Sequence, residues 1–337
     1  MIDFRSDTFT KPTAGMLQAM FSAEVGDDVF SEDPTVNALE DKAAKLFGME
    51  AGLFCPSGTM TNQIAIKCHT HPGDEVVCDN QSHVYIYEGG GIAFNSGCQV
   101  KSITGDRGKI TADDIIASIN PDDVHKPRTR LVSLENTTNR GGGSCYDIIA
   151  LEQIKEVCLL HDLKLHLDGA RLFNALVAMD QQPVEFGELF DSISICLSKG
   201  LGTPVGSVLL GTEDFIRSAR RIRKVFGGGM RQAGYIAAAG VYALDHNIKR
   251  LAIDHLHAKQ IAEALLKKSF TGKMKPVETN IIIFEVISSY TPETLAEAFK
   301  KYDIKVMAIS LKEVRMVLHL DVTEDMVQET IAVIHDL

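Results

Sequence analysis

The sequence has no long apolar run, no paired cysteine motif and no excess of positive charge, and each absence excludes a class of protein. No stretch approaches the ~20 consecutive apolar residues of a membrane-spanning helix. The seven cysteines are scattered without a C-x-x-C pair, which indicates reduced thiols rather than a disulfide framework. With 34 Lys and Arg against 45 Asp and Glu, the net charge of -11 disfavours nucleic acid as a partner.

Targeting, metal and nucleotide motifs are absent as well. Met1 is followed at once by charged residues instead of an apolar signal segment, so we predict a cytoplasmic protein. Four potential metal ligands lie near one another, namely Cys68, His69, His71 and Cys78. Their spacing fits no zinc pattern, and we predict no metal site. The glycine triplets at 89–91 and 227–229 lack the G-x-G-x-x-G spacing after a strand, which excludes a dinucleotide site.

The composition is that of an ordinary globular protein, and the order of its expected elements predicts an α/β fold. At 337 residues with 45% hydrophobic residues, the chain is long enough for a large core and about two domains. Strand-like runs alternate with helix-like runs from about residue 50 to 210, which predicts βαβ units on a mostly parallel sheet. After Gly272 the order of strands and helices changes, which predicts a small α+β unit.

Three local patterns make definite structural predictions. Asp33 before Pro34 is typical of a helix start, and the apolar spacing that follows predicts a helix ending at Gly48. The run 192–197 predicts a buried strand, and 206–210 a second strand that returns beside it. A long helical region is predicted over 233–268.

Lys199 is the residue around which the sequence is best understood. It follows the buried strand 192–197 and precedes Gly200. An ammonium at the mouth of a buried strand loses hydration, which favours its neutral form and makes it a nucleophile toward a carbonyl. A solvated loop lysine is the alternative, since most lysines are exposed.

Other polar residues also follow strand runs, and the carboxyl ends of parallel strands line one ligand crevice. They are Gly58, His83, Glu135 and Asp168. A lysine that forms an imine, an acid for a ring nitrogen and a helix start for a phosphate are what pyridoxal phosphate requires. Asp168 would hold the pyridine nitrogen protonated, and His83 would stack on the ring.

With these residues in view, the chain resembles the low-specificity L-threonine aldolases, pyridoxal-phosphate enzymes with the aspartate-aminotransferase-type fold. The likeness covers nearly the whole length. The segments that carry it are RSDT (5–8), GDDVFSEDPTVNALE (26–40), PSGTMTNQ (56–63), SHVYIYEGGG (82–91), RTRLVSLENTTN (128–139), LHLDGARLFNA (165–175) and LSKGLGTPVGS (197–207). Together they are specific, although no single segment is.

The resemblance implies a fold and a set of roles. The fold is a PLP-dependent transferase fold (fold type I), with a mostly parallel seven-stranded sheet and a small α+β C-terminal domain. The implied division is an arm at 1–20, a large domain at 21–245 and a small domain at 246–337. For the cofactor, the implied residues are Lys199 for the Schiff base, Asp168 for the pyridine nitrogen, Gly58 and Thr59 for the phosphate, His83 for the ring, and Arg171. For the substrate carboxylate they are Ser6, Arg171 and Arg315. His125 is implied as a second active-site histidine, and Arg231 as a residue that reaches a phosphate across a subunit boundary.

The implied reaction is cleavage of L-threonine or L-allo-threonine to glycine and acetaldehyde in a homotetramer with shared sites. His83 and His125 are the candidates for the base, because an imidazole titrates near neutral pH, and a bound water is a third candidate. The same set of groups also suits a β-eliminating lyase or an aminotransferase, since the outcome depends on which Cα bond breaks.

Overall fold

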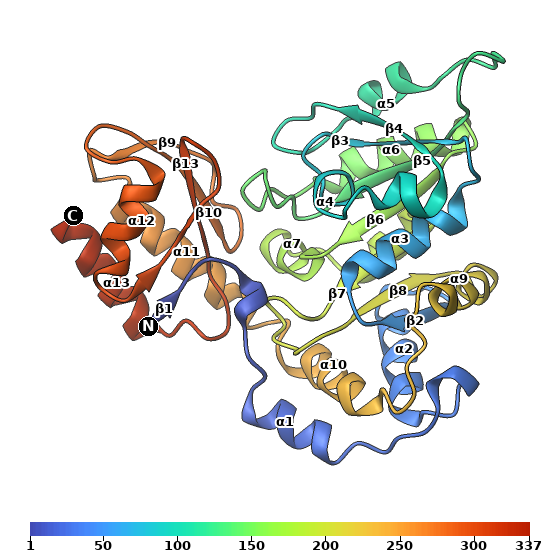
Figure 1. Ribbon diagram of the computed structural model, residues 1–337, viewed down its shortest axis with the longest axis horizontal. Helices are drawn as coiled ribbons and strands as arrows, with labels where there is room; N and C mark the ends of the chain where they lie inside the picture. Colours follow the sequence, from blue (N-terminus) through green and yellow to red (C-terminus); the bar gives the residue numbers. More distant parts are fainter.

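Seven strands between residues 51 and 211 form the central sheet of the computed structural model, which describes residues 1–337 (Figure 1). They are β2 (Ala51–Cys55), β3 (Glu75–Asp79), β4 (Gln99–Ile103), β5 (Thr129–Glu135), β6 (Lys164–Gly169), β7 (Ser192–Cys196) and β8 (Ser207–Gly211). The order is β2-β8-β7-β6-β5-β3-β4, and β8 alone runs antiparallel to both of its neighbours. The predicted mostly parallel seven-stranded sheet is confirmed.

The second strand, which was predicted to pair with the strand before Lys199, is also confirmed. β7 and β8 are completely buried and pair with each other, with Cys196 opposite Ser207. Gly202 and Gly206 in the connection have φ angles of 83° and 120°, a region that favours glycine. The connection therefore places Lys199 at the carboxyl end of β7.

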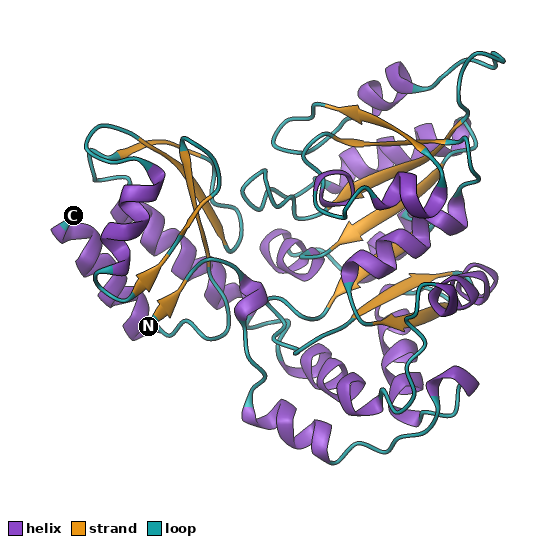
Figure 2. Ribbon diagram, in the orientation of Figure 1, coloured by secondary structure: helices purple, strands orange, loops and turns teal.

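Helices cover both faces of this sheet (Figure 2). They are α2 (Pro34–Phe47), α3 (Gly58–His69), α4 (His83–Ile86), η3 (Ile92–Ser96), α5 (Ala112–Ser118), α6 (Ile148–Leu160), α7 (Leu172–Met179), α8 (Pro183–Leu189), α9 (Glu213–Val225) and α10 (Gly234–His246). The helix predicted after Asp33 is confirmed: Asp33 accepts the Thr35 and Val36 N–H groups, and Gly48 ends the helix at a φ of 63°.

The C-terminal part forms a smaller α+β unit, as predicted. It contains α11 (Leu251–Leu265), β9 (Thr271–Met274), β10 (Ile281–Val286), α12 (Pro292–Lys300), β11 (Ile304–Lys305), β12 (Met307–Ala308), β13 (Glu313–Val317) and α13 (Glu324–Asp336). Four of its strands form an antiparallel sheet in the order β12-β13-β10-β9. The helical region predicted over 233–268 is interrupted between α10 and α11, where the buried Asn247 donates to the Leu201 carbonyl at 2.8 Å.

The N-terminal segment joins both units. β1 (Ile2–Asp3) pairs in parallel with β11, and Phe4 is buried in the core of the C-terminal unit. After η1 (Asp7–Phe9), α1 (Ala14–Phe21) packs on α10, and η2 (Asp28–Phe30) follows. The domain limits at residues 20 and 245 stay a prediction, although residues 2–4 pack with the C-terminal unit. No helix combines the length and apolar character that crossing a membrane demands.

Candidate active site

A cavity of about 420 Å³ opens at the carboxyl edge of the sheet, between it, the N-terminal segment and the C-terminal unit. Its lining residues are Ser6, Thr8, His83, Tyr87, Glu135, Asn139, Arg140, Ala170, Arg171, Lys199, Met307, Ala308, Ile309 and Arg315. Half of the predicted site residues are among them, from segments more than 300 positions apart in the chain. The fold therefore brings Ser6, His83, Arg171, Lys199 and Arg315 to one cavity.

Lys199 enters this cavity from the turn after β7. The turn is closed by the Gly202 N–H, which donates to the Lys199 carbonyl at 2.8 Å. Burial raises the pKa of the Cys196 thiol, but the nearby Lys199 ammonium and the Ser198 hydroxyl lower it more, so that it lies below the ordinary value. Lys199 therefore lies close to a buried thiol at the end of the same strand.

Asp168 and Glu135 end neighbouring strands and face each other in register. Oδ1 of Asp168 accepts the Ala170 N–H, whereas Oδ2 is buried without any hydrogen-bond partner. Burial and the Asp168 charge raise the pKa of Glu135 to about 7, although Glu135 accepts N–H groups of His83 and Asn139, both at 2.8 Å. A buried carboxylate oxygen without a donor is costly, so Asp168 has the environment that a protonated ring nitrogen would satisfy.

The N-terminus of α3 offers a second group of unused donors. Gly58 and Thr59 form its first turn, and the Ser57 hydroxyl accepts the Met60 N–H. Ser207 lies beside them: its buried hydroxyl has no partner, and a Cβ added at Gly58 would lie 3.4 Å from it. Free N–H groups at a helix start and a free hydroxyl suit a phosphate. Together with Asp168 and Lys199, these residues fit pyridoxal phosphate.

His83 lies at the start of α4, close to the carboxylates of Glu88, Glu135 and Asp168. Its Nδ1 is 2.9 Å from Oε1 of Glu88. Burial alone would lower the pKa of His83, but the Glu88 hydrogen bond and the Asp168 charge raise it above the ordinary value. One ligand atom from each of His83, Glu88 and Asp168 lies within 4.8 Å of the others. The hydrogen bond to Glu88 leaves Nε2 of His83 available to a ligand.

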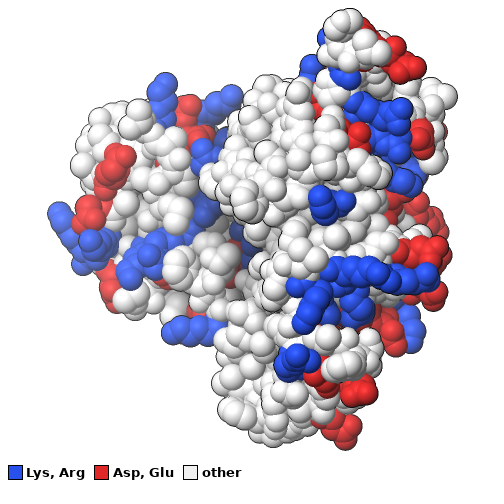
Figure 3. Space-filling view, turned by 45° about the vertical axis from the view of Figure 1, so that its right-hand side comes forward, with Lys and Arg blue, Asp and Glu red and all other residues white.

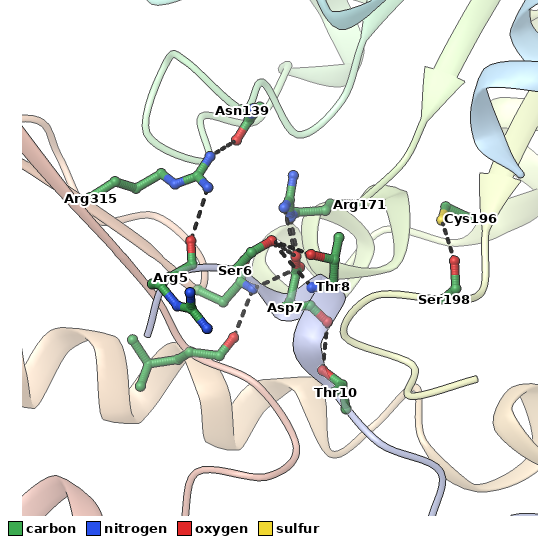
Figure 4. A network of polar contacts seen from close by, with 12 residues as sticks. Arg5, Ser6, Asp7, Thr8, Thr10, Asn139, Arg171, Cys196, Ser198 and Arg315 are labelled. Atoms are coloured by element: carbon green, nitrogen blue, oxygen red, sulfur yellow. Dashed lines mark hydrogen bonds and ion pairs between the residues drawn. The ribbon is translucent and has the colours of Figure 1, made fainter. Parts of the chain in front are cut away.

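Arg171 and Arg315, two of the three arginines that line the cavity, differ in their partners (Figure 4). Arg171 donates to both oxygens of Asp7, whereas Arg315 contacts no carboxylate. Arg315 donates to Asn139 Oδ1 at 2.8 Å and to the Arg5 carbonyl at 3.0 Å, and its buried Nε has no partner. Burial and the Arg171 charge lower the pKa of Arg315 to about 10. Arg315 is therefore a buried arginine of the cavity without an acidic partner, whereas Arg140, which also lacks one, is only partly buried.

Of the five predicted site residues that do not line the cavity, Gly58, Thr59 and Asp168 belong to the groups described above, and two lie elsewhere in the chain. His125 is on an exposed loop before β5, where Nδ1 is 2.8 Å from Asp123. Arg231 is half-exposed and pairs with Asp27 at 2.7 Å. Figure 3 shows a band of Lys and Arg side chains on the side of the molecule where α9 lies. Arg223 on α9 is instead buried and pairs with Asp28 at 2.8 Å, so its charge is used within the chain.

Sequence reasoning assigned no role to four buried polar residues around the cavity. They are Asp7, Glu88, Glu135 and Ser207. Asp7 and Glu88 lie inside the segments RSDT and EGGG, so a hydrophilic residue beside a site residue was the available signal. Ser207 likewise ends the segment LSKGLGTPVGS (197–207), although a serine at the start of a strand is ordinary by itself.

Comparison with known proteins agrees with this geometry. Residues 3–289 match the family described as beta-eliminating lyase. The low specificity L-threonine aldolase of Escherichia coli (strain K12) is 44% identical over 333 residues, covering 98% of each chain. The structure of a threonine aldolase from Leishmania major is similar with a TM-score of 0.87 at 21% identity, covering 100% of this chain and 99% of that one. A serine palmitoyltransferase with bound PLP has a TM-score of 0.75 at 15% identity, covering 99% and 86%. These two structures share the fold.

Proposed function

This chain belongs to the low-specificity L-threonine aldolases within the beta-eliminating lyase family, and we propose that it cleaves L-threonine and L-allo-threonine to glycine and acetaldehyde with pyridoxal phosphate. The observation that carries the proposal is Oδ2 of Asp168, buried without a partner at the sheet edge where Lys199 also lies. A protonated pyridine nitrogen is the cation that such an oxygen needs.

The cofactor would be held from three sides. We assign Lys199 to its covalent attachment and Asp168 to its ring nitrogen, and the first turn of α3 with Ser207 to its phosphate. His83 would contact the ring face. Bound pyridoxal phosphate supplies an electron sink for the carbon that keeps the electron pair when the Cα–Cβ bond breaks.

Arg315 is our assignment for the substrate carboxylate. It has buried, unused hydrogen-bonding capacity and no acidic partner, and a guanidinium binds a carboxylate with two parallel hydrogen bonds. Ser6, which follows the Arg5 carbonyl that Arg315 contacts, adds a hydroxyl to the cavity. Arg171 is already neutralised by Asp7, so it contributes as a hydrogen-bond donor at the site rather than as a free charge.

Nε2 of His83 would take the proton from the substrate β-hydroxyl. The other ring nitrogen is engaged by Glu88, which leaves Nε2 as the free atom. A carboxylate that accepts from Nδ1 makes the opposite nitrogen a better base and fixes its direction. His125 is exposed in its own chain, and we assign it to the cavity of a neighbouring subunit.

We further propose a homotetramer built from dimers with shared sites, in which Arg231 reaches the phosphate of a partner. Large apolar side chains are exposed on the single chain, among them Phe21, Phe30 and Phe94 at 82%, 68% and 88%. Exposed aromatic groups of this size favour burial between subunits. Light scattering of the purified protein should give four chains of 36.8 kDa. Mixing His125→Ala with Lys199→Ala protein before reassembly should restore part of the activity if sites are shared.

A product assay tests the central proposal. Purified protein with L-threonine should release glycine and acetaldehyde in equal amounts without an added keto acid. Lys199→Ala should lose this activity, the yellow colour of the bound cofactor and the cofactor that borohydride fixes to the protein. Lys101→Ala, at an exposed position on β4, is the matched control and should keep all three.

The same assay separates the alternatives. A β-eliminating lyase would release ammonia and 2-oxobutanoate from threonine, and an aminotransferase would need a keto acid. Either result, or a colourless protein that never binds pyridoxal phosphate, would overturn the proposal.

For the location we propose the cytoplasm, which is supported by seven unpaired cysteines. A role in amino-acid metabolism follows from the proposed substrates.

A further inference from the structure

Helix α3 lies on one face of the central sheet (Figure 1). This face is polar at its middle, although buried parallel strands are usually apolar. His166 on β6 and Ser192 on β7 are both completely buried there. Buried polar groups are costly unless they are hydrogen-bonded, and a fully paired set fixes one arrangement of its members. The partners of these two residues therefore indicate what the polar layer is for.

His166 makes one hydrogen bond from each ring nitrogen. Nδ1 is 2.8 Å from the Ser192 hydroxyl, and Nε2 is 3.2 Å from Oδ1 of Asn62 on α3. Burial lowers the pKa of His166 to about 3, and the neighbouring His69 adds to this effect. The ring is therefore neutral at physiological pH, with one nitrogen that donates and one that accepts.

Glu88 fixes the direction of these hydrogen bonds. Its side chain is fully buried and accepts N–H groups from Asn62 at 2.9 Å and from Gln63 at 2.7 Å. Because the Asn62 amide nitrogen points to Glu88, its oxygen points to His166. Nε2 of His166 must then donate, and Nδ1 must accept the hydrogen of the Ser192 hydroxyl.

The network continues to the opposite edge of the sheet. Nε2 of His69 is 2.8 Å from the Ser192 hydroxyl oxygen, whose hydrogen is already used, so His69 donates. Burial lowers the pKa of His69 to about 4, and its ring stacks on Phe215 with centroids 4.6 Å apart. Each hydrogen bond from His69 inward therefore points toward the Glu88 carboxylate. We call this set the Glu88 network: Glu88, Asn62, His166, Ser192 and His69.

The end of the network lies at the candidate active site, because Glu88 also accepts from Nδ1 of His83. We propose that the Glu88 network is a positioning device for His83: its aligned hydrogen bonds hold the Glu88 carboxylate against Nδ1, so that Nε2 always faces the cavity. Asn62, His166 and Ser192 are thus positioning residues that act through Glu88. This inference rests on the proposed function in one respect only, namely that His83 takes the proton of the substrate β-hydroxyl.

Several charged groups face His83 and affect its pKa. They are Glu88 beside its ring, Asp168 on β6, Glu135 at its backbone N–H on β5, and Lys199 after β7. Glu88 and Asp168 raise the pKa of His83, whereas burial and Lys199 lower it. Around His166, the facing groups are His69 and Asp168. Loosening Glu88 should therefore lower the pKa of His83 while the other charges stay in place.

The test is a titration of His83 by NMR in the purified full-length protein labelled with ¹³C-histidine, with its signal assigned by its loss in His83→Asn. Glu88→Gln should shift the His83 midpoint to lower pH, because the anion is removed. Ser192→Ala should shift it in the same direction by less, and Ser192→Thr, which keeps the hydroxyl, should return it toward the wild-type value. The acid limb of kcat/KM should move with the midpoint.

Ser133→Ala is the matched control, because Ser133 is a buried serine on β5 whose hydroxyl has no partner, and it should leave the midpoint unchanged. If Ser192→Ala does not fold, His166→Gln takes its place, since an amide reproduces at most one of the two ring hydrogen bonds. A folded variant with the wild-type His83 midpoint would overturn the inference. The NMR readout needs no turnover, so failure of the proposed function gives a different result.

Discussion

Arg171 donates two hydrogen bonds of 2.7 Å to the carboxylate of Asp7, and both side chains are almost completely buried. This pair ties the N-terminal segment to the loop after β6, across 164 positions of sequence. It also distinguishes Arg171 from Arg315, because Arg315 is left without an acidic partner. The pair therefore both stabilises the cavity wall and determines which arginine is free for a ligand.

Breaking this pair should be costly. Asp7→Asn leaves the Arg171 charge buried without compensation, and we expect a loss of about 3 kcal/mol in the free energy of unfolding, measured by urea denaturation. Asp3→Asn breaks the partly exposed pair with Arg5 and is the control, with an expected loss of about 0 to 1 kcal/mol. Equal losses in the two variants would contradict the buried pair's importance.

The same pair should contribute to acid sensitivity. Burial raises the pKa of Asp7, but the Arg171 charge and hydrogen bonds outweigh it and bring the value to about 2, below the ordinary 3.8. A lowered carboxyl pKa adds stability that is present above pH 3.8 and is lost as the pH falls toward about 2. The melting temperature of the wild type should therefore fall over that pH window by more than the melting temperature of Asp7→Asn. Parallel curves of melting temperature against pH for the two proteins would contradict the lowered pKa of Asp7.

Arg315→Lys should weaken substrate binding without unfolding the protein. A lysine keeps the charge but loses the paired hydrogen bonds to a carboxylate, so we expect KM for L-threonine to rise by about 10- to 100-fold. Arg5→Lys, at an arginine outside the cavity lining, should leave KM near the wild-type value. An unchanged KM in Arg315→Lys would remove Arg315 from the substrate site.

Ser207→Ala should weaken the binding of pyridoxal phosphate and leave the stability of the protein nearly unchanged. Its hydroxyl has no hydrogen-bond partner of normal geometry within the chain, although it helps to lower the pKa of the nearby Cys196 thiol, so its loss costs little in the protein without cofactor. A hydrogen bond to a charged group contributes about 1.5 to 3 kcal/mol, and we expect the dissociation constant of pyridoxal phosphate to rise about tenfold or more. Equilibrium dialysis measures this, with Ser133→Ala as control; equal affinities would exclude Ser207 from the phosphate site.

Glu135 should make stability depend on pH near neutrality. Burial and the Asp168 charge raise its pKa to about 7 from 4.5. Because the pKa is raised in the folded protein, Glu135 makes its full contribution to the free energy of unfolding below pH 4.5, and this contribution is lost as the pH rises to about 7. The wild type should therefore lose unfolding free energy relative to Glu135→Gln between these values. A difference between the two proteins that does not change with pH would contradict the raised pKa.

The sequence by itself determined the elements whose cause is local. The helix after Asp33 follows from its capping residues and its apolar spacing, and the β7–β8 return follows from two buried runs around glycines. Strand ends in a parallel sheet lie at one edge, so Lys199, Asp168 and Gly58 were predicted together without coordinates. Ser6 and Arg315 came only from the resemblance, since no spacing rule connects the two ends of the chain.

Tertiary structure alone decided the partners of the charged and polar side chains. The sequence shows Arg171 and Arg315 as equivalent cations, but their roles differ because only Arg171 meets Asp7. The Glu88 network likewise depends on the register of β6 with β7 and on α3 lying above them. Hydrogen bonds require partners within about 3 Å and in the right direction, and sequence spacing does not encode such contacts between distant segments.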